Sequence, residues 1–98
     1  MMNAKRKRVR PTSFRLGSVC VTRGAADTLD QEDILRAVGR HARRDWGDVC
    51  EADWERNDQS VEEGFRLLSV YRSRSGMRFW VITEADRSVT TVLLPEEY

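Results

Sequence analysis

The sequence is poor in the residues that build metal and redox sites. It has two cysteines and one histidine in 98 residues, and Cys20 and Cys50 are too far apart to form a metal-binding motif. We expect both cysteines to be reduced residues of the core, as is usual in a small intracellular protein. No metal or cofactor is therefore expected.

Long apolar runs are missing as well. No stretch approaches the roughly 20 apolar residues that a membrane-spanning helix needs. The basic N-terminus is not followed by the apolar segment of a secretory signal. These two absences predict a cytoplasmic protein with no membrane partner.

What the sequence does have is a core-forming composition with an uneven distribution of charge. Hydrophobic residues make up 40% of the chain and charged residues 34%, which is typical of a chain that folds. Residues 1–11 contain no acidic residue, whereas residues 12–98 carry 12 basic and 16 acidic ones, a formal charge of −4. We therefore predict a basic disordered arm over residues 1–12 and a single domain over residues 13–98.

The arm has two interpretations. Its cations could neutralise phosphates of DNA or RNA, an interaction that is insensitive to sequence and weakens steeply with salt. Alternatively it is a solvated tail, since it has no aromatic residue on which a base could stack. The basic residues concerned are Lys5, Arg6, Lys7, Arg8 and Arg10.

The last third of the chain predicts a three-stranded antiparallel meander. Residues 67–72, 77–83 and 88–94 are rich in β-branched and aromatic residues, and turn-forming residues separate them. Gly76 can supply the positive φ of a hairpin loop, and Pro95 cannot donate to a ladder and ends the last strand. Bulky side chains on both faces of the middle run indicate a central strand.

The first part of the domain predicts one strand and two helices. Residues 14–22 alternate as a strand does, and residues 25–28 suit a brief helical turn. A capping pattern then begins a helix that should end near residues 43–44. A second helix is expected from about residue 49 to residue 68, with Trp54, Val61, Phe65 and Leu68 on its core face. The single histidine, His41, lies beside the apolar stripe of the first helix and is expected at the boundary of the core.

This order predicts an α+β fold with the topology β-α-α-β-β-β. A two-helix hairpin would pack on one face of a four-stranded, mainly antiparallel sheet, with the first strand beside a strand of the meander. An edge strand of the meander could pair across a two-fold axis and give a homodimer. The sequence does not indicate which edge is exposed.

Asn57 and Asp58 interrupt the apolar face of the second helix. Buried polar groups need partners, because an unmet one costs about 1–3 kcal/mol. We favour a structural role, in which either residue bonds the loop backbone at 46–48 or the ends of the strands. The alternative is a recognition or acid–base site shared with Glu84, Asp86 and Arg87.

Most of the chain from about Gly17 onward resembles a family of small uncharacterised bacterial proteins. The stretches that carry the likeness are Arg44-Asp45-Trp46-Gly47-Asp48, residues 54–68 with Asn57-Asp58, and residues 80–98. Members are often labelled plasmid-related, and some carry the name of a restriction-system subunit that looks misassigned. The resemblance implies association with a plasmid or mobile element, and it transfers no activity or site residues.

A second likeness is one of topology alone. A strand, two helices and a three-stranded meander also resemble RelE/ParE-type toxins, some of which cleave messenger RNA and others of which poison gyrase. Cleavage requires cations that hold the phosphate and stabilise developing charge, and the candidates are Arg66, Arg72, Arg74 and Arg78, with Tyr71. The acidic body argues against this alternative, because an RNA-cleaving toxin should be strongly basic.

The leading hypothesis is therefore a non-enzymatic binding or accessory protein of a mobile element, whose partner is a protein, a nucleic acid or both. Large aromatic residues and arginine are frequent at interface hot spots. The candidate interaction surface consists of Trp46, Asn57, Asp58, Arg72, Arg74, Arg78, Trp80, Glu84, Asp86 and Arg87.

The arm hypothesis leads to a simple test. A version of the protein that begins at Thr12 should bind labelled duplex DNA and single-stranded RNA much more weakly than the full chain, because it lacks five cations. Fluorescence anisotropy across a salt titration measures the difference. Equal binding by both forms would assign nucleic-acid recognition to the folded body.

Overall fold

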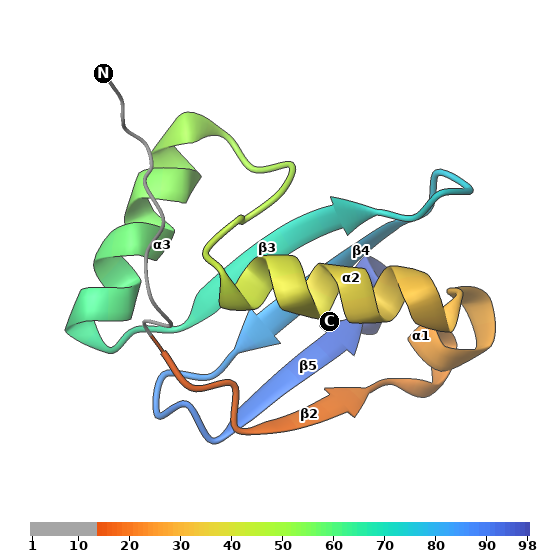
Figure 1. Cartoon of the computed structure of the whole chain (residues 1–98), viewed down its shortest axis with the longest axis horizontal. Coiled ribbons are helices and arrows are strands. Elements are labelled where there is room, and N and C mark those ends of the chain that lie inside the picture. Colours follow the sequence, from red (N-terminus) through yellow and green to blue (C-terminus); the bar gives the residue numbers. More distant parts are fainter. Residues whose placement is uncertain (1–13) are drawn as a thin grey trace.

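A computed structural model describes residues 14–98 (Figure 1). The predicted basic arm lies outside the described residues. The predicted α+β fold, with a two-helix hairpin on a four-stranded sheet, is confirmed, and the expected brief helical turn is a helix of its own. In chain order the elements are β2 (Ser18–Val21), α1 (Arg23–Thr28), α2 (Gln31–Ala42), α3 (Glu51–Glu63), β3 (Leu67–Arg72), β4 (Arg78–Thr83), β5 (Val89–Leu93) and the short 3-10 helix η1 (Pro95–Glu97).

The sheet has the strand order β2-β5-β4-β3. β4 pairs antiparallel with β3 on one side and with β5 on the other, so the meander and its central strand are confirmed. β2 pairs parallel with β5. The parallel pair is possible because the helices between β2 and β3 carry the chain back to the end of the sheet from which β2 started.

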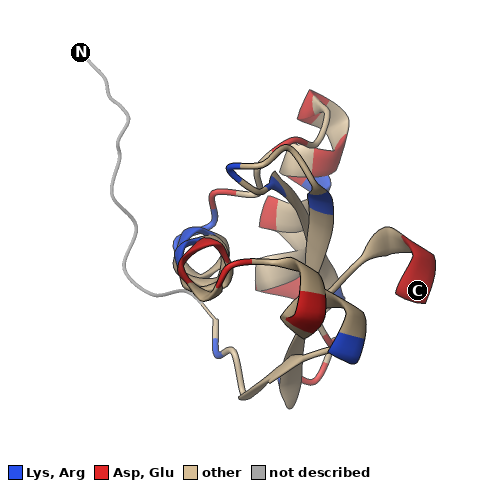
Figure 2. Ribbon diagram, turned by 90° about the vertical axis from the view of Figure 1, so that its right-hand side faces the viewer, with Lys and Arg blue, Asp and Glu red and all other residues tan. Residues whose placement is uncertain are grey.

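The main core lies between α2 and the sheet face that α2 crosses in Figure 1. Alternate residues of the strands point to this face, as the two-residue repeat of a strand requires. Tyr71, Phe79, Val81 and Val92 are buried there against Ala37 of α2. On the opposite face η1 contacts β4, and Figure 2 shows α2 and the C-terminus on opposite sides of the sheet.

Two predicted boundaries are wrong, and a glycine explains each. α3 ends at Glu63 instead of near residue 68, because Gly64 adopts the left-handed conformation (φ 81°) and closes the helix with its N–H on the Ser60 carbonyl. Leu68 therefore belongs to β3, and Phe65 is 57% exposed between the two elements. The first strand begins at Ser18 instead of residue 14, because Gly17 (φ 67°) bends the chain close to the Ser88 carbonyl.

Three predictions about burial are wrong as well. Cys20 and Cys50 were expected in the core, yet both are exposed free thiols. His41 was expected at the core boundary, yet it is completely buried. These differences depend on which side of each element meets the rest of the chain. His41 lies on the side of α2 that faces the sheet, Cys20 lies in β2, where every residue is exposed, and Cys50 precedes α3 as its N-cap.

His41 belongs to a chain of buried hydrogen bonds that crosses the sheet. Its Nδ1 lies 2.6 Å from the Ser69 hydroxyl and its Nε2 lies 2.9 Å from the Thr83 hydroxyl. Thr83 lies 2.7 Å from the Thr90 hydroxyl, which donates to the Leu16 carbonyl at 2.7 Å. Since Thr90 uses its single proton on Leu16, Thr83 must donate to Thr90 and accept from His41 Nε2–H. Burial keeps the ring neutral, so Nδ1 carries no proton and accepts from the Ser69 hydroxyl, which fixes the tautomer.

Aromatic rings keep this region dry. The rings of Phe14 and Trp46 meet the His41 imidazole edge-on, with centroids at 5.5 and 5.4 Å. Burial away from water, with a smaller contribution from the nearby charge of Arg87, lowers the pKa of His41 to about 3. The fold therefore requires the neutral form of this residue.

The loop between α2 and α3 covers the β3 edge of the sheet. Val70 of β3 donates to the Trp46 carbonyl at 3.1 Å, and its own carbonyl accepts from Asp48 N–H at 2.7 Å. Gly47 lies between them in an isolated parallel bridge with Val70. Its φ is 80°, and a Cβ there would lie 2.0 Å from the Val70 carbonyl oxygen, so only glycine fits.

The buried histidine predicts a specific loss of stability in mild acid. The pKa of His41 is about 3 when folded and 6.5 in its ordinary state, so the unfolded chain takes up a proton below pH 6.5 that the folded chain does not. Stability is full above pH 6.5 and should fall by about 1.4 kcal/mol per pH unit below it, or about 2 kcal/mol by pH 5. Urea unfolding between pH 7 and pH 5 measures this slope.

The variant His41→Asn is the control, since it removes the chain's one histidine. It should lower the free energy of unfolding at pH 7 but make that energy nearly independent of pH in this window. The lowered pKa values of Asp86 and Glu97 act only in stronger acid. An unchanged slope in the variant would contradict the assignment to His41.

Candidate functional site

The β2 edge of the sheet is the one that no described segment covers. Ser18 N–H donates to the Ser88 carbonyl and Thr22 N–H donates to the Val92 carbonyl, both at 3.0 Å, so these residues face β5. By the alternation of a strand, the N–H and C=O groups of Val19 and Val21 point outward from the sheet. Every residue of β2 is exposed.

An apolar groove of about 510 Å³ runs between β2 and α2. Val19 and Val21 form its floor, and they are 48% and 39% exposed. Leu35, on the outer side of α2, is 63% exposed. The lining of the groove is completed by Ala26, Leu29, Gln31, Ile34 and Val38.

The helical repeat of α2 produces this groove. Gln31, Leu35 and Val38 fall on one side of the helix, whereas Ala37 and His41 fall on the side that enters the sheet. The apolar surface of α2 is therefore wider than the part that the sheet covers. The exposed remainder faces the open strand.

The predicted interaction residues near α3 are held in structural contacts. Asn57 is buried, and its amide exchanges two hydrogen bonds with the Leu68 backbone at 2.8 and 3.2 Å. The structural role favoured for this residue, a bond to a strand end, is confirmed. Asp58 instead accepts from side chains, Trp46 Nε1 at 3.1 Å and Arg44 Nη2 at 3.1 Å.

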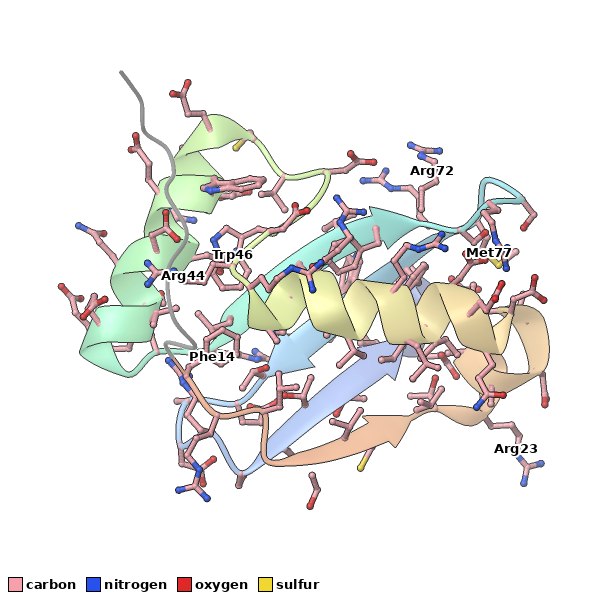
Figure 3. All side chains as sticks on the ribbon, in the orientation of Figure 1. Phe14, Arg23, Arg44, Trp46, Arg72 and Met77 are labelled. Carbon is pink, nitrogen blue, oxygen red and sulfur yellow. The ribbon has the colours of Figure 1, made fainter. Side chains whose placement is uncertain are left out.

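Trp46 and Arg44 complete this contact between the helices. Trp46 is fully buried and lies between α3 and the end of α2 (Figure 3). Arg44 is 7% exposed and has a positive φ of 68°, a conformation that directs its guanidinium toward Asp58. A buried arginine needs such a carboxylate, because an unpaired buried charge is strongly destabilising.

The loop between β4 and β5 docks on α3 through Arg87. Its guanidinium donates to the carbonyls of Ser60, Phe65 and Glu84 at 2.8–3.0 Å. Burial lowers the pKa of Arg87. Asp86 is turned to Ser88, whose hydroxyl and N–H donate to the carboxylate and lower its pKa. Arg87 thus meets α3 through backbone carbonyls.

Trp80 lies on the sheet face away from α2. It is partly exposed, and its ring meets that of Tyr98 edge-to-face with centroids at 5.5 Å. The guanidinium of Arg66 lies over the Tyr98 ring, 5.2 Å from the ring centroid. The Nε of Arg66 is 3.7 Å from Oε1 of Glu84. This aromatic pair covers part of a sheet face that no long helix within residues 14–98 covers.

The arginines near the β3–β4 hairpin are spread over several acidic partners. Arg74 contacts Asp30, Glu32 and Asp33 at 2.9–3.2 Å. Arg72 is 3.8 Å from Asp48 and extends from the β3 edge in Figure 3. Arg78, which is exposed, pairs with Arg72 in the ladder.

The proposed companion of these arginines, Tyr71, is only 2% exposed. Its hydroxyl donates to the Asp45 carbonyl at 2.6 Å, and burial raises its pKa. The toxin-like constellation of Tyr71 with a free arginine cluster is therefore not assembled here. A phenol in this state is poorly placed for proton transfer to a ligand.

Three further findings bear on function. In residues 14–98 no three His, Cys, Asp or Glu side chains gather closely enough to hold a metal ion. Within the same part of the chain, no helix combines the length and apolar character needed to cross a bilayer. Comparisons with models of protein families, with curated proteins and with solved structures found no match.

The groove and the open edge were missed by the sequence interpretation. Val19 and Val21 fall within the predicted strand of residues 14–22, and Leu35 falls within the predicted first helix, and neither segment was singled out as a site. The available signal was the absence of any charged residue between Arg15 and Arg23. Edge strands usually carry charge or proline that discourages pairing. An uncharged strand at an edge lacks these features and is therefore a candidate for pairing with another strand.

The contact between α3 and β3 gives a testable prediction. Asn57→Ala should lower the free energy of unfolding by about 1–3 kcal/mol, because it leaves the partly buried N–H and C=O of Leu68 without their partner. Chemical denaturation measures the loss. Gln59→Ala, on an exposed position of the same helix, is the matched control and should change stability little. Equal losses in the two variants would contradict a special role for Asn57.

Proposed function

We propose that this protein is a non-enzymatic binding module that captures a partner by strand addition at the β2 edge. The observation that carries the proposal is the asymmetry of the sheet. The β3 edge is bonded to the loop at Trp46 and Asp48, whereas the outward backbone groups of Val19 and Val21 meet no described segment. An added strand would satisfy these groups.

The groove supplies the specificity that backbone bonds lack. In an added strand every second side chain would point to the α2 side of the sheet. There it would meet Val19, Val21 and Leu35, which are the large exposed apolar side chains of the groove. The expected ligand is therefore an extended protein segment with apolar residues at alternate positions.

The size of the site indicates a short ligand segment. β2 has four residues, with Gly17 bending the chain before it and α1 beginning at Arg23 after it. Only about two outward residues can form backbone hydrogen bonds to the ligand. Each such hydrogen bond contributes about 0.5–1.5 kcal/mol net to the free energy of binding. Burial of apolar area in the groove must supply the rest of the affinity. The family resemblance adds the proposal that the partner belongs to the same plasmid or mobile element.

The test compares two lysine variants of equal chemistry. Val19→Lys places a charge on the groove floor at the open edge, and Phe65→Lys places one on an exposed apolar site near α3. A partner that co-purifies with the wild-type protein should be reduced at least about tenfold by Val19→Lys and retained by Phe65→Lys. The reverse pattern would overturn the proposal.

Hydrogen exchange on the purified complex provides the second readout. Partner binding should protect the amides of Val19 and Val21. The amide of Cys20 should change little, because it faces β5 already. Protection confined to β3 or α3 would place the partner elsewhere.

A further inference from the structure

We infer that the strand that pairs with the β2 edge is β2 of a second copy of this chain, antiparallel to the first and related to it by a two-fold axis at Cys20. The inference rests on the proposed function, since it names the occupant of the same edge. It makes the module a homodimer with one continuous sheet across both copies.

The register follows from which backbone groups are free. Val19 and Val21 point outward, and Ser18 and Thr22 are bonded to β5. In an antiparallel ladder, outward residues of the two strands must face each other. The arrangement that uses all of them places Val19 opposite Val21 of the second copy and Val21 opposite Val19. Each of these pairs exchanges two hydrogen bonds, and Cys20 then faces Cys20 of the second copy at the axis.

No charge within the strand opposes this pairing. No charged residue lies between Arg15 and Arg23, so nothing in β2 repels its own copy. The two-fold axis brings Arg15 of one copy to the end of the ladder where α1 of the other begins. Asp27 of α1 is exposed, as is Arg15, and neither has an ion-pair partner among the described residues. Arg23, the first residue of α1, is a second cation at this end and extends outward beyond the end of β2 in Figure 3.

Apolar surface is shared in the same arrangement. A two-fold axis perpendicular to the sheet keeps Val19 and Val21 of both copies on the side of α2. Their side chains become neighbours across the new ladder, and the two grooves join. Because a ladder of this length buries less than the 1,200 Å² or more of stable complexes, the dimer should be weak and should dissociate on dilution.

Cysteine cross-linking tests the register. Residues facing each other without mutual hydrogen bonds have Cα atoms about 4.5 Å apart, which lies within the range of a disulfide. The full-length variant Cys50→Ser keeps only Cys20, and Cys20→Ser keeps only the exposed Cys50. Diamide takes up the two thiol hydrogens as the disulfide forms. The dimer band should appear at least about tenfold faster with Cys20 than with Cys50, because paired thiols are at a high effective concentration.

A third variant controls for unspecific collision at the edge. Ser18→Cys in a chain with both native cysteines replaced by serine puts one exposed thiol two residues from the axis. In the proposed register it faces Thr22 of the second copy and should cross-link as slowly as Cys50. Equal rates at positions 18 and 20 would overturn the register.

Oligomeric state supplies the second measurement. Sedimentation velocity should show the wild-type and Phe65→Lys proteins passing from monomer to dimer with concentration, and Val19→Lys remaining monomeric. A monomer at all concentrations, with slow cross-linking at Cys20, overturns the inference. The proposed function is decided separately, by whether a different protein is lost with Val19→Lys. If such a protein is lost while the chain stays monomeric, strand addition stands and the second copy is excluded.

Discussion

The buried imidazole of His41 joins the long helix over the sheet to two of the strands beneath it. Through its two nitrogens it connects α2 to β3 and β4, and the hydroxyl of Thr90 extends the connection to β5 and to the segment that enters β2. Each hydroxyl donates in one direction only, so the chain of bonds works for a single tautomer of a neutral ring. A network of this kind stabilises one arrangement strongly, because every member left without a partner is penalised in the dry interior.

Anchored in this way, α2 lies over the middle of the sheet and leaves β2 without cover. At the opposite edge the close approach of Gly47 to Val70 fixes the loop against β3. The hydrogen bonds from Arg44 and Trp46 to Asp58 then fix the position of α3 relative to that loop. The position of the open edge is thus a consequence of contacts made elsewhere in the domain.

The parts of the fold that could be predicted are those with a local cause. The meander follows from alternation within each run, from Gly76 in its first turn and from Pro95 at its end. The second predicted helix was extended too far beyond Gly64. A glycine can adopt the left-handed conformation that ends a helix, but the sequence pattern does not require it to do so. Burial of His41 and exposure of Cys20 could not be predicted, since both depend on which sides of α2 and β2 meet the rest of the chain. The candidate site could not be predicted either. The first strand was correctly placed beside the meander, but whether its outer edge is open depends on whether another described segment pairs with it, and none does.

A sheet with one blocked edge can take part only in assemblies that close. If both edges were free, each added copy would offer a new edge to the next, and the chain of pairings would have no natural end. The bridge between Gly47 and Val70 removes that possibility, so pairing through β2 stops at a finite particle. The loop between α2 and α3 therefore also limits how many copies could be joined by edge-to-edge strand pairing.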